Sequence, residues 1–343
     1  MSSSSKPISG ARAAAAEQTA LQQPWLVADI GGTNARFGWV DGAGVQQVQT
    51  LPTAAYPDPQ AAVADYLAGL AQTLGPAYRA PRAAAFAVAT AVAEDCVSFT
   101  NSHWSFSRRA LRDALALADL LVLNDFEALA LSLPRLTPAQ TSRIGPALSA
   151  PLAPLAVIGP GTGLGVAGLV PTPHGWVALA GEGGHASLSA ADDFEAALLA
   201  AARREHTHVS AERLLSGIGL PVLHRAVAQV LGLPATALQA GEIVERALAG
   251  DDPSCVRCID SFCALLGSFA GNAALTLGAR GGVFIGGGIV PRLGGHFQRS
   301  RFRQRFVDKG RLEPYLSQIP TALITDTLAA LTGAALALEQ VGQ

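Results

Sequence analysis

Two glycine-rich turns, each between two apolar runs, constrain the fold of this 343-residue chain more than any other feature. The first turn, 31–33, lies inside the segment 26–40, and the second, 159–163, lies inside 155–170. Each pattern predicts a strand, a turn and a second strand. One such turn is usually only a tight hairpin. Two of them, each opening a long segment, favour a duplicated fold.

The same turns offer a way to bind an anion. Closely spaced glycines let backbone N–H groups converge without interference from a Cβ atom, and Thr33 and Thr162 add hydroxyl groups. A turn of this kind can hold a multiply charged anion such as a polyphosphate. We therefore expect two phosphate-binding hairpins that face each other.

Composition narrows the class of protein. Hydrophobic residues make up 50% of the chain, which is long enough for a large core and two domains. The net charge of -2 gives no basic stripe for nucleic acid, so we expect a small-molecule partner. Lysine occurs only at Lys6 and Lys309, and no Gly-Lys-Ser/Thr tripeptide exists. A Walker A loop is therefore excluded.

The 4 cysteines do not form a disulfide framework in a chain of this length, so reduced thiols are expected. Cys255 and Cys258 form a Cys-x-x-Cys motif, which is typical of zinc or redox sites. No second pair of ligands accompanies them, and the surrounding pattern is helical. We expect buried structural thiols.

The N-terminal residues 1–24 are rich in serine and alanine and lack the apolar stretch of a signal peptide. They predict a disordered extension. No segment offers 18 consecutive apolar residues, so we expect neither a membrane span nor a membrane partner.

The rest of the chain alternates strand and helix patterns, which is typical of an α/β fold. Strands are expected within the two hairpins and at 45–50, 83–89, 120–123, 282–285 and 322–325. Helices are expected at 61–74, 108–117, 193–204, 221–231, 240–248, 255–277 and 328–338. The basic stretch 299–311 is expected to form a solvated helix face.

A polar pair, Asn124 and Asp125, directly follows the fully apolar run 120–123. Polar residues at the carboxyl end of a buried parallel strand lie where ligands bind in open α/β sheets. Asp125 also precedes a helical pattern and could cap that helix. The residues alone leave both roles open.

A second polar loop holds Glu182 and His185, which are separated by two glycines. Such a loop contributes little to packing, so its polar groups favour a ligand, with a structural turn as the alternative. Further along, Ser210 is expected to cap a helix whose first turn holds Glu212.

Two segments can each be interpreted in two ways, and the residues favour neither interpretation. Segment 97–106 is either an edge strand and loop, or a substrate-side loop in which Asn101 and His103 contact hydroxyl groups. Three glycines at 286–288 follow a buried strand. They either let a flat ligand such as a purine lie against the backbone or form a tight strand-to-helix turn.

Together these motifs resemble those of the bacterial glucokinases, within the hexokinase and actin-like ATPase superfamily. The motifs lie at 29–36, 123–126, 159–165, 181–185, 208–213 and 286–292. The resemblance implies an α/β fold of two ribonuclease-H-like (actin-like ATPase) domains with a ligand cleft between them. It implies a small domain at 25–135, completed by a C-terminal helix at 326–343, and a large domain at 136–325.

The resemblance also implies the activity, which is ATP-dependent phosphorylation of the glucose 6-hydroxyl to glucose 6-phosphate, feeding glycolysis. Asp125 corresponds to the general base that takes the proton of that hydroxyl. The implied sugar-binding residues are Asn101, Asn124, Asp125, Glu182, His185 and Glu212. The implied nucleotide-binding residues are Asp29, Gly31, Gly32, Thr33, Asn34, Gly161, Thr162, Gly163, Gly286, Gly287 and Gly288. Asp29 would also face the Mg²⁺ region.

These roles agree with the chemistry of phosphoryl transfer, which depends mostly on positioning and charge neutralisation. Two backbone turns and Mg²⁺ can therefore serve where lysine is absent. The resemblance further implies a cytoplasmic protein without structural zinc, and a homodimer is common in the family. The chain departs from the family at 90–93, where a proline commonly lies in the substrate-side loop.

Two other functional classes compete with this interpretation. Gly163, Gly165 and Gly168 match the G-x-G-x-x-G motif of dinucleotide-dependent oxidoreductases, but no helix is expected to open there. A sugar-responsive transcriptional regulator would need a DNA-binding unit, and we expect the 24-residue N-terminal segment to be too short for a helix-turn-helix.

Overall fold

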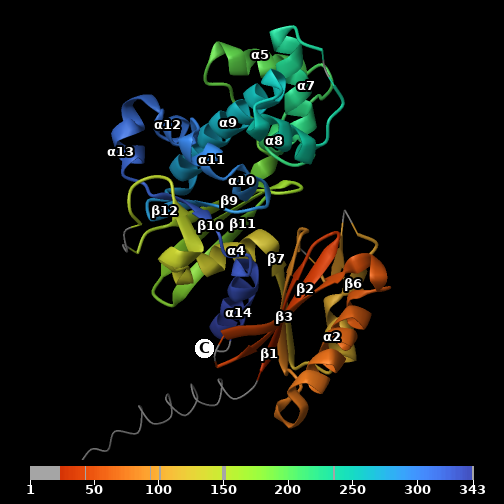
Figure 1. The fold of residues 1–343 in the computed structure, drawn as a ribbon. Coiled ribbons are helices and arrows are strands. Elements are labelled where there is room, and N and C mark those ends of the chain that lie inside the picture. The colour runs from red at the N-terminus through yellow and green to blue at the C-terminus, as the bar shows by residue number, and fades with distance from the viewer. Residues whose placement is uncertain are drawn as a thin grey trace, which may run out of the picture. The chain divides into compact units, whose positions relative to one another are not determined.

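The computed structural model describes residues 24–42, 44–92, 94–99, 102–148, 152–234 and 236–341. Asn101 and nearly all of the expected N-terminal extension lie outside these residues, as does part of the departing loop at 90–93. The chain divides into two compact units, of which unit 1 is Met1–Ser132 with Leu328–Gln343 and unit 2 is Leu133–Thr327. Each unit combines helices with a mixed sheet, so the predicted α/β class is confirmed (Figure 1).

Unit 1 contains a five-stranded sheet of order β3-β2-β1-β4-β7. Its strands are β1 (Trp25–Ile30), β2 (Asn34–Asp41), β3 (Gly44–Pro52), β4 (Ala83–Val88) and β7 (Asp119–Asn124). Strand β2 pairs antiparallel with both β1 and β3, whereas β1, β4 and β7 are parallel. The predicted hairpin and the three predicted strands that follow it are therefore confirmed. The parallel register places Ile30 beside Val88, and Val88 beside Asn124, at the carboxyl ends of the strands.

The sheet of unit 1 packs against helices and a small hairpin. The elements are α2 (Pro59–Leu74), β5 (Cys96–Ser98), β6 (Ser105–Ser107), α3 (Arg108–Ala114), α4 (Asp125–Ser132) and α14 (Ala329–Val341). Helix α2 buries Tyr66, whose ring stacks on Phe37 of β2 with 5.5 Å between centroids. Ser107 caps α3, because its hydroxyl accepts a hydrogen bond from the Ala110 N–H at 3.1 Å. Residues 97–98 and 105–106 belong to the β5–β6 pair, which agrees with the strand interpretation of segment 97–106, and residues 100–101 lie outside the described part of the chain.

Helix α14 comes from the end of the chain and packs on α4 and on strands β1 and β4. Figure 1 shows it in dark blue beside the red and orange strands of unit 1. Its backbone approaches α4 closely, since a Cβ atom at Gly333 would overlap the carbonyl group of Ala128. Glycine is therefore required where these two helices cross.

Unit 2 contains a six-stranded sheet of order β11-β10-β9-β12-β13-β8. Its strands are β8 (Thr141–Arg143), β9 (Leu155–Pro160), β10 (Leu164–Thr172), β11 (Gly175–Gly181), β12 (Gly282–Ile285) and β13 (Thr321–Ile324). Strands β9, β12 and β13 are parallel. Strand β10 pairs antiparallel with both β9 and β11. The second predicted hairpin is confirmed. As in unit 1, an antiparallel three-stranded segment is followed by parallel strands.

The helices of unit 2 surround one long buried helix. They are α5 (Asp193–Ala202), α6 (Ala211–Leu214), α7 (Leu220–Leu231), α8 (Ala240–Ala249), α9 (Pro253–Leu277), α10 (Ile289–Leu293), α11 (Gly295–Arg299), α12 (Phe302–Val307) and α13 (Glu313–Ser317). Among the described residues, α9 is the one helix long and apolar enough to cross a membrane, and 78% of its most apolar window is buried. Core helices pass the same test, so α9 is only weak support for a membrane span.

The expectation of a solvated helix face at 299–311 is wrong for α12. This helix buries Phe302, Arg305 and Phe306. Arg305 is 4% exposed and donates to the buried carboxylate of Glu195 at 2.6 Å. The two phenylalanines are four residues apart and form an apolar stripe, and Arg305 lies on the same side. Local charge predicted solvent exposure, whereas apolar spacing and a distant glutamate determine the burial.

Three of the four cysteines lie in α9, and all three are buried free thiols, as predicted for the Cys-x-x-Cys pair. Burial disfavours the thiolate. It raises the pKa of Cys255 to about 11 and that of Cys263 to about 12, and the pKa of Cys258 lies well above its ordinary value. Cys96 is exposed.

Replacing Gly333 with alanine is expected to lower the free energy of unfolding by about 1–3 kcal/mol, because α14 must move away from Ala128. Gly69→Ala is the matched control, since a Cβ atom at this exposed position in α2 meets nothing within 4 Å. That substitution should stabilise the protein by about 0.5–1 kcal/mol. Urea unfolding of both variants tests this packing, and an unchanged Gly333→Ala protein would contradict it.

Maleimide labelling at pH 8 should modify Cys96 within minutes and leave the three cysteines of α9 unmodified. At this pH a thiol with a pKa of about 11 is ionised in about one molecule in a thousand, and burial also blocks the reagent. Mass spectrometry of intact protein and peptides measures the labelled positions. All four thiols should react in denaturant, and rapid native labelling of Cys258 would show that α9 is not packed as described.

Candidate functional site

The first group of predicted site residues lies at the carboxyl end of β7 in unit 1. The Asn124 amide donates to the Thr90 carbonyl oxygen at 3.2 Å. Its side-chain oxygen and the Asp125 carboxylate each accept from the Phe126 N–H at 2.9 Å. Helix α4 begins at Asp125 itself, so Asn124 occupies the preceding, capping position. Both residues therefore cap the helix, so Asp125 is not confined to a capping role.

Glu127 in the first turn of α4 was not among the predicted site residues. It lies two residues after Asp125 and is partly buried, and burial raises the pKa of its carboxyl group, which a hydrogen bond from the Asn124 backbone opposes. The sequence shows acidic residues at the start of a helix, but this pattern is common at helix N-termini. Sequence alone therefore could not distinguish this residue from a helix-stabilising charge.

The first glycine turn connects β1 to β2 in unit 1. The Gly31 N–H donates to the Asn34 carbonyl oxygen at 2.9 Å, which closes the turn. Thr53 stabilises the turn through two hydrogen bonds. Its N–H donates to the Thr33 carbonyl at 2.9 Å, and its hydroxyl donates to the Gly32 carbonyl at 2.8 Å. These bonds occupy carbonyl oxygens of the turn, while Thr33 and Asn34 remain exposed.

Asp29 lies on β1 just before this turn. Its carboxylate is 3.9 Å from the guanidinium of Arg36, which is its partner across the β1–β2 pair. Burial raises the pKa of Asp29, and the positive charge of Arg36 opposes that change. From the described residues the carboxylate accepts no hydrogen bond, although its side chain is only 31% exposed. A partly buried carboxylate with so little compensation is suited to a nearby cation.

The second glycine turn connects β9 to β10 in unit 2. The Gly161 N–H donates to the Gly163 carbonyl at 2.9 Å. The segment after α6 supports the turn, because the Gly217 N–H donates to the Gly161 carbonyl at 2.7 Å and the Ile218 N–H to the Thr162 carbonyl at 3.4 Å. This supporting segment was not predicted. Its only signal is a pair of glycines, Gly217 and Gly219, between two helices.

Glu212 joins this turn to the predicted sugar-binding residues. Its carboxylate accepts from the Leu164 N–H at 2.8 Å. A Cβ atom at Gly163 would lie 2.5 Å from the same carboxylate oxygen, so a larger residue there would push the Glu212 side chain out of this position. Ser210 caps α6 as predicted, by accepting from the Arg213 N–H at 3.2 Å, and this cap fixes the helix that carries Glu212.

Three predicted sugar-binding side chains converge in unit 2. The imidazole Nε2 of His185 lies 3.9 Å from the Glu182 carboxylate and 3.7 Å from that of Glu212. Glu182 and His185 are exposed, whereas Glu212 is only 21% exposed. The glycines between the first two also have a packing reason, because a Cβ atom at Gly184 would overlap the Leu164 carbonyl. The loop is therefore a tight structural turn that also presents polar groups.

The three glycines at 286–288 form a strand-to-helix turn between β12 and α10. The Gly286 N–H donates to the Ile158 carbonyl at 2.8 Å. Gly287 has a φ of +77° and lies against the Pro160 carbonyl, so a larger residue would be both strained and too close. The turn thus lies directly beside the second glycine turn. The oxidoreductase motif fails here, since Gly165 and Gly168 lie within strand β10 rather than before a helix.

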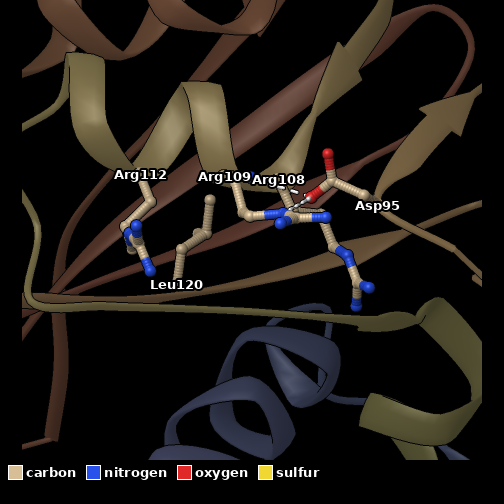
Figure 2. Close-up of a pocket in the computed structure, with 5 residues that line it drawn as sticks. All are labelled: Asp95, Arg108, Arg109, Arg112 and Leu120. Carbon is tan, nitrogen blue, oxygen red and sulfur yellow. Dashed lines mark hydrogen bonds and ion pairs between the residues drawn. The ribbon is translucent and has the colours of Figure 1, made fainter.

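A cavity of about 270 Å³ in unit 1 lies apart from these residues. It is lined by Asp95, Arg108, Arg109, Arg112 and Leu120 (Figure 2). Leu120 is at the start of β7, four residues and roughly 13 Å before Asn124 along the strand. The Asp95 carboxylate is held by Ser107 and Arg109, which lower its pKa. This cavity is therefore not the predicted site.

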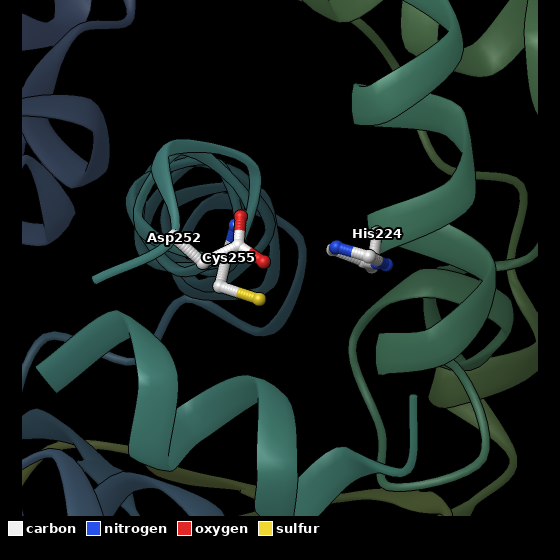
Figure 3. A group of neighbouring side chains, drawn as sticks. All are labelled: His224, Asp252 and Cys255. Carbon is white, nitrogen blue, oxygen red and sulfur yellow. The ribbon is translucent and has the colours of Figure 1, made fainter. Parts of the chain in front are cut away.

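Another group in unit 2, His224, Asp252 and Cys255, could in principle hold a metal ion, with one ligand atom of each within 4.8 Å of the others. Figure 3 shows His224 on α7 facing the start of α9. The Ser254 hydroxyl donates to Asp252 at 2.6 Å and lies 2.8 Å from the His224 Nε2. Asp252 also accepts from the Ser254 and Cys255 N–H groups as the cap of α9. Helix capping accounts for the arrangement.

Comparison with known proteins identifies the family. A model of the glucokinase family matches residues 26–341. The glucokinase of Chromobacterium violaceum is 50% identical over 92% of this chain and 90% of its own length, and that of Aromatoleum aromaticum is 49% identical over 92% and 95%.

Solved structures agree with these relatives. The crystal structure of a glucokinase from an Antarctic psychrotroph is 40% identical, covers 92% of this chain and 99% of its own, and superposes with a TM-score of 0.84. A Balamuthia mandrillaris glucokinase in complex with glucose has the same fold at 20% identity, covering 96% and 99% of the two chains with a TM-score of 0.75. This chain therefore belongs to the glucokinase family, whose members use ATP to phosphorylate glucose.

Proposed function

We propose that this glucose kinase uses Asp125 as the general base that takes the proton of the sugar 6-hydroxyl. The single observation that carries the proposal is the position of Asp125 at the carboxyl end of the parallel strand β7. Neighbouring Asn124 is fixed by hydrogen bonds to Thr90 and Phe126, so it can present a sugar-hydroxyl ligand in a defined orientation. A base and an adjacent hydroxyl ligand are what phosphoryl transfer to an alcohol requires.

The remaining sugar contacts are proposed for Glu182, His185 and Glu212. The imidazole of His185 lies within 3.9 Å of both carboxylates, and the three groups offer acceptors and a donor for several hydroxyl groups. Asn101 is proposed as a further contact and lies outside the described residues. These residues come from both units, and the mixed sheet of each unit supports an actin-like ATPase fold of two ribonuclease-H-like domains.

The ATP phosphates are proposed to lie at the turns 31–34 and 161–163, with the adenosine near 286–288. Backbone N–H groups of such turns favour anions without needing a lysine. The donor set before the first turn suits Mg²⁺, because Asp29 is a partly buried oxygen ligand whose charge is weakly compensated. When bound, Mg²⁺ would neutralise phosphate charge. We place the enzyme in the cytoplasm and retain the homodimer as an expectation of the family.

Formation of hexose phosphate over a panel of hexoses, with ATP, GTP and polyphosphate as donors, tests the substrate assignment. Glucose with Mg-ATP should give the highest ratio of kcat to KM. Circular dichroism on the same preparation shows whether the protein is folded. Folded protein that forms no hexose phosphate with glucose and Mg-ATP would overturn the proposed function.

The variant Asp125→Asn should retain glucose binding and lose turnover by about 10²- to 10⁴-fold, because an amide cannot accept the hydroxyl proton. Asparagine caps a helix nearly as well as aspartate, so the melting temperature should stay the same. Asp119→Asn, at the exposed opposite end of β7, is the matched control and should keep wild-type kcat. Coupled kinetics and glucose calorimetry measure these effects. Wild-type turnover of Asp125→Asn would move the base assignment to Glu182.

The variant Gly163→Ala should weaken glucose binding by about tenfold, since the new Cβ atom displaces the Glu212 carboxylate and leaves the Leu164 N–H without its acceptor. Gly161→Ala in the same turn is the control, because its Cβ atom would meet nothing within 4 Å. Calorimetry with glucose alone compares the two, so that effects on nucleotide binding do not enter. Equal glucose affinities would show that Glu212 does not bind the sugar from this position.

A further inference from the structure

Unit 2 contains another cavity, and none of the residues that line it is assigned to glucose or ATP binding. Its volume is about 170 Å³, and it is formed by the start of α5, the middle of α9 and the residues between α11 and α12. The charged residues that line it are Arg257, Arg299, Arg301, Asp192, Glu195 and Asp260. The cavity therefore brings opposite charges together at a place that the phosphoryl transfer does not use.

The carboxylates of this cavity already have partners. Asp192 caps α5 by accepting from the Glu195 N–H at 2.9 Å. Glu195 accepts from the Ala191 N–H at 2.8 Å and from Arg305 at 2.6 Å. Asp260 lies 3.1 Å from the imidazole of His296. The negative charges are thus compensated within the protein.

The three arginines of the lining have no such partners. Arg257 lies over the ring of Phe194, with 4.1 Å from its guanidinium carbon to the ring centroid, which leaves its N–H groups free. Within the described part of the chain, the guanidinium groups of Arg257, Arg299 and Arg301 make no hydrogen bond or ion pair. Guanidinium groups bind carboxylate and phosphate groups through paired N–H donors. The free donors of the cavity therefore suit an anion.

The side chain of Glu195 is a second, independent reason to expect a ligand in the cavity. It is 97% buried, given an exposed fraction of 3%, and its Oε1 atom receives no hydrogen bond from any described residue. A buried carboxylate oxygen without a donor is unfavourable, and the hydrogen bond from Arg305 to the other oxygen offsets only part of this cost. A ligand hydroxyl group directed at this oxygen would satisfy it.

We propose that this cavity binds a small organic anion that also carries a hydroxyl group. Its phosphate or carboxylate group lies among Arg257, Arg299 and Arg301, and its hydroxyl donates toward Glu195. The volume restricts the ligand to a few carbon atoms. The binding is independent of the kinase reaction, because none of the lining residues belongs to the proposed glucose and ATP sites.

Calorimetry with matched ligand pairs tests the proposal. Glycerol 3-phosphate is compared with propyl phosphate, and malate with succinate, so that each pair differs only in hydroxyl groups. Each titration uses the full chain at physiological ionic strength, with glucose, Mg²⁺ and a non-hydrolysable ATP analogue present to fill the proposed active site. The hydroxylated member of at least one pair should bind saturably at millimolar concentrations and several-fold more tightly than its partner.

Substitutions locate the binding. The double variant Arg257→Gln/Arg301→Gln should weaken it by about tenfold or more, because charge-assisted hydrogen bonds are lost. Arg280→Gln, at an exposed position outside the cavity, is the matched control and should bind as wild type does. Thermal unfolding shows that both variants are folded. The proposal is overturned if no ligand binds saturably, if the double variant binds unchanged, or if the hydroxyl group makes no difference in either pair.

Discussion

Parallel strand pairing is the constraint on which the rest of the structure depends. In unit 1 the register aligns the carboxyl ends of β1, β4 and β7, so the first glycine turn, the loop at Thr90 and Asp125 gather at one edge of the sheet. In unit 2 the alignment of β9 with β12 brings the turn 159–163 beside 286–288. Residues far apart in sequence become neighbours because the strand ends do, which is the general origin of ligand sites in open α/β sheets.

Glycine is favoured for a different physical reason at each of three positions in unit 2. Gly163 leaves room for a carboxylate, Gly184 for the backbone of the neighbouring strand, and Gly287 for the Pro160 carbonyl in a left-handed conformation. All three let main chain or a charged group approach more closely than a side chain would allow. The turns that we propose to hold phosphate are therefore defined by contacts within the protein before any ligand binds, which reduces the ordering that binding would require.

The elements that could be predicted from sequence are those with a local signal. Apolar runs beside glycines located both hairpins, and Ser210 was identified as a cap because capping involves only the next three residues. Local signals failed where a distant partner decides the outcome. Arg305 is buried because Glu195, 110 residues away, meets it, and Gly217 and Ile218 support a turn that lies more than 50 residues earlier. Spacing within one segment cannot contain such information.

The return of α14 to unit 1 has a consequence for synthesis of the chain. Strands β1 and β4 emerge from the ribosome early, but the helix that packs on them emerges only after the whole of unit 2, Leu133–Thr327. At ordinary rates of translation the delay is roughly 10–40 s. During that time unit 2 can complete its core, whereas the part of the earlier sheet that α14 covers stays exposed to chaperones. Helix α14 therefore completes the packing of the first sheet only after unit 2 has been made.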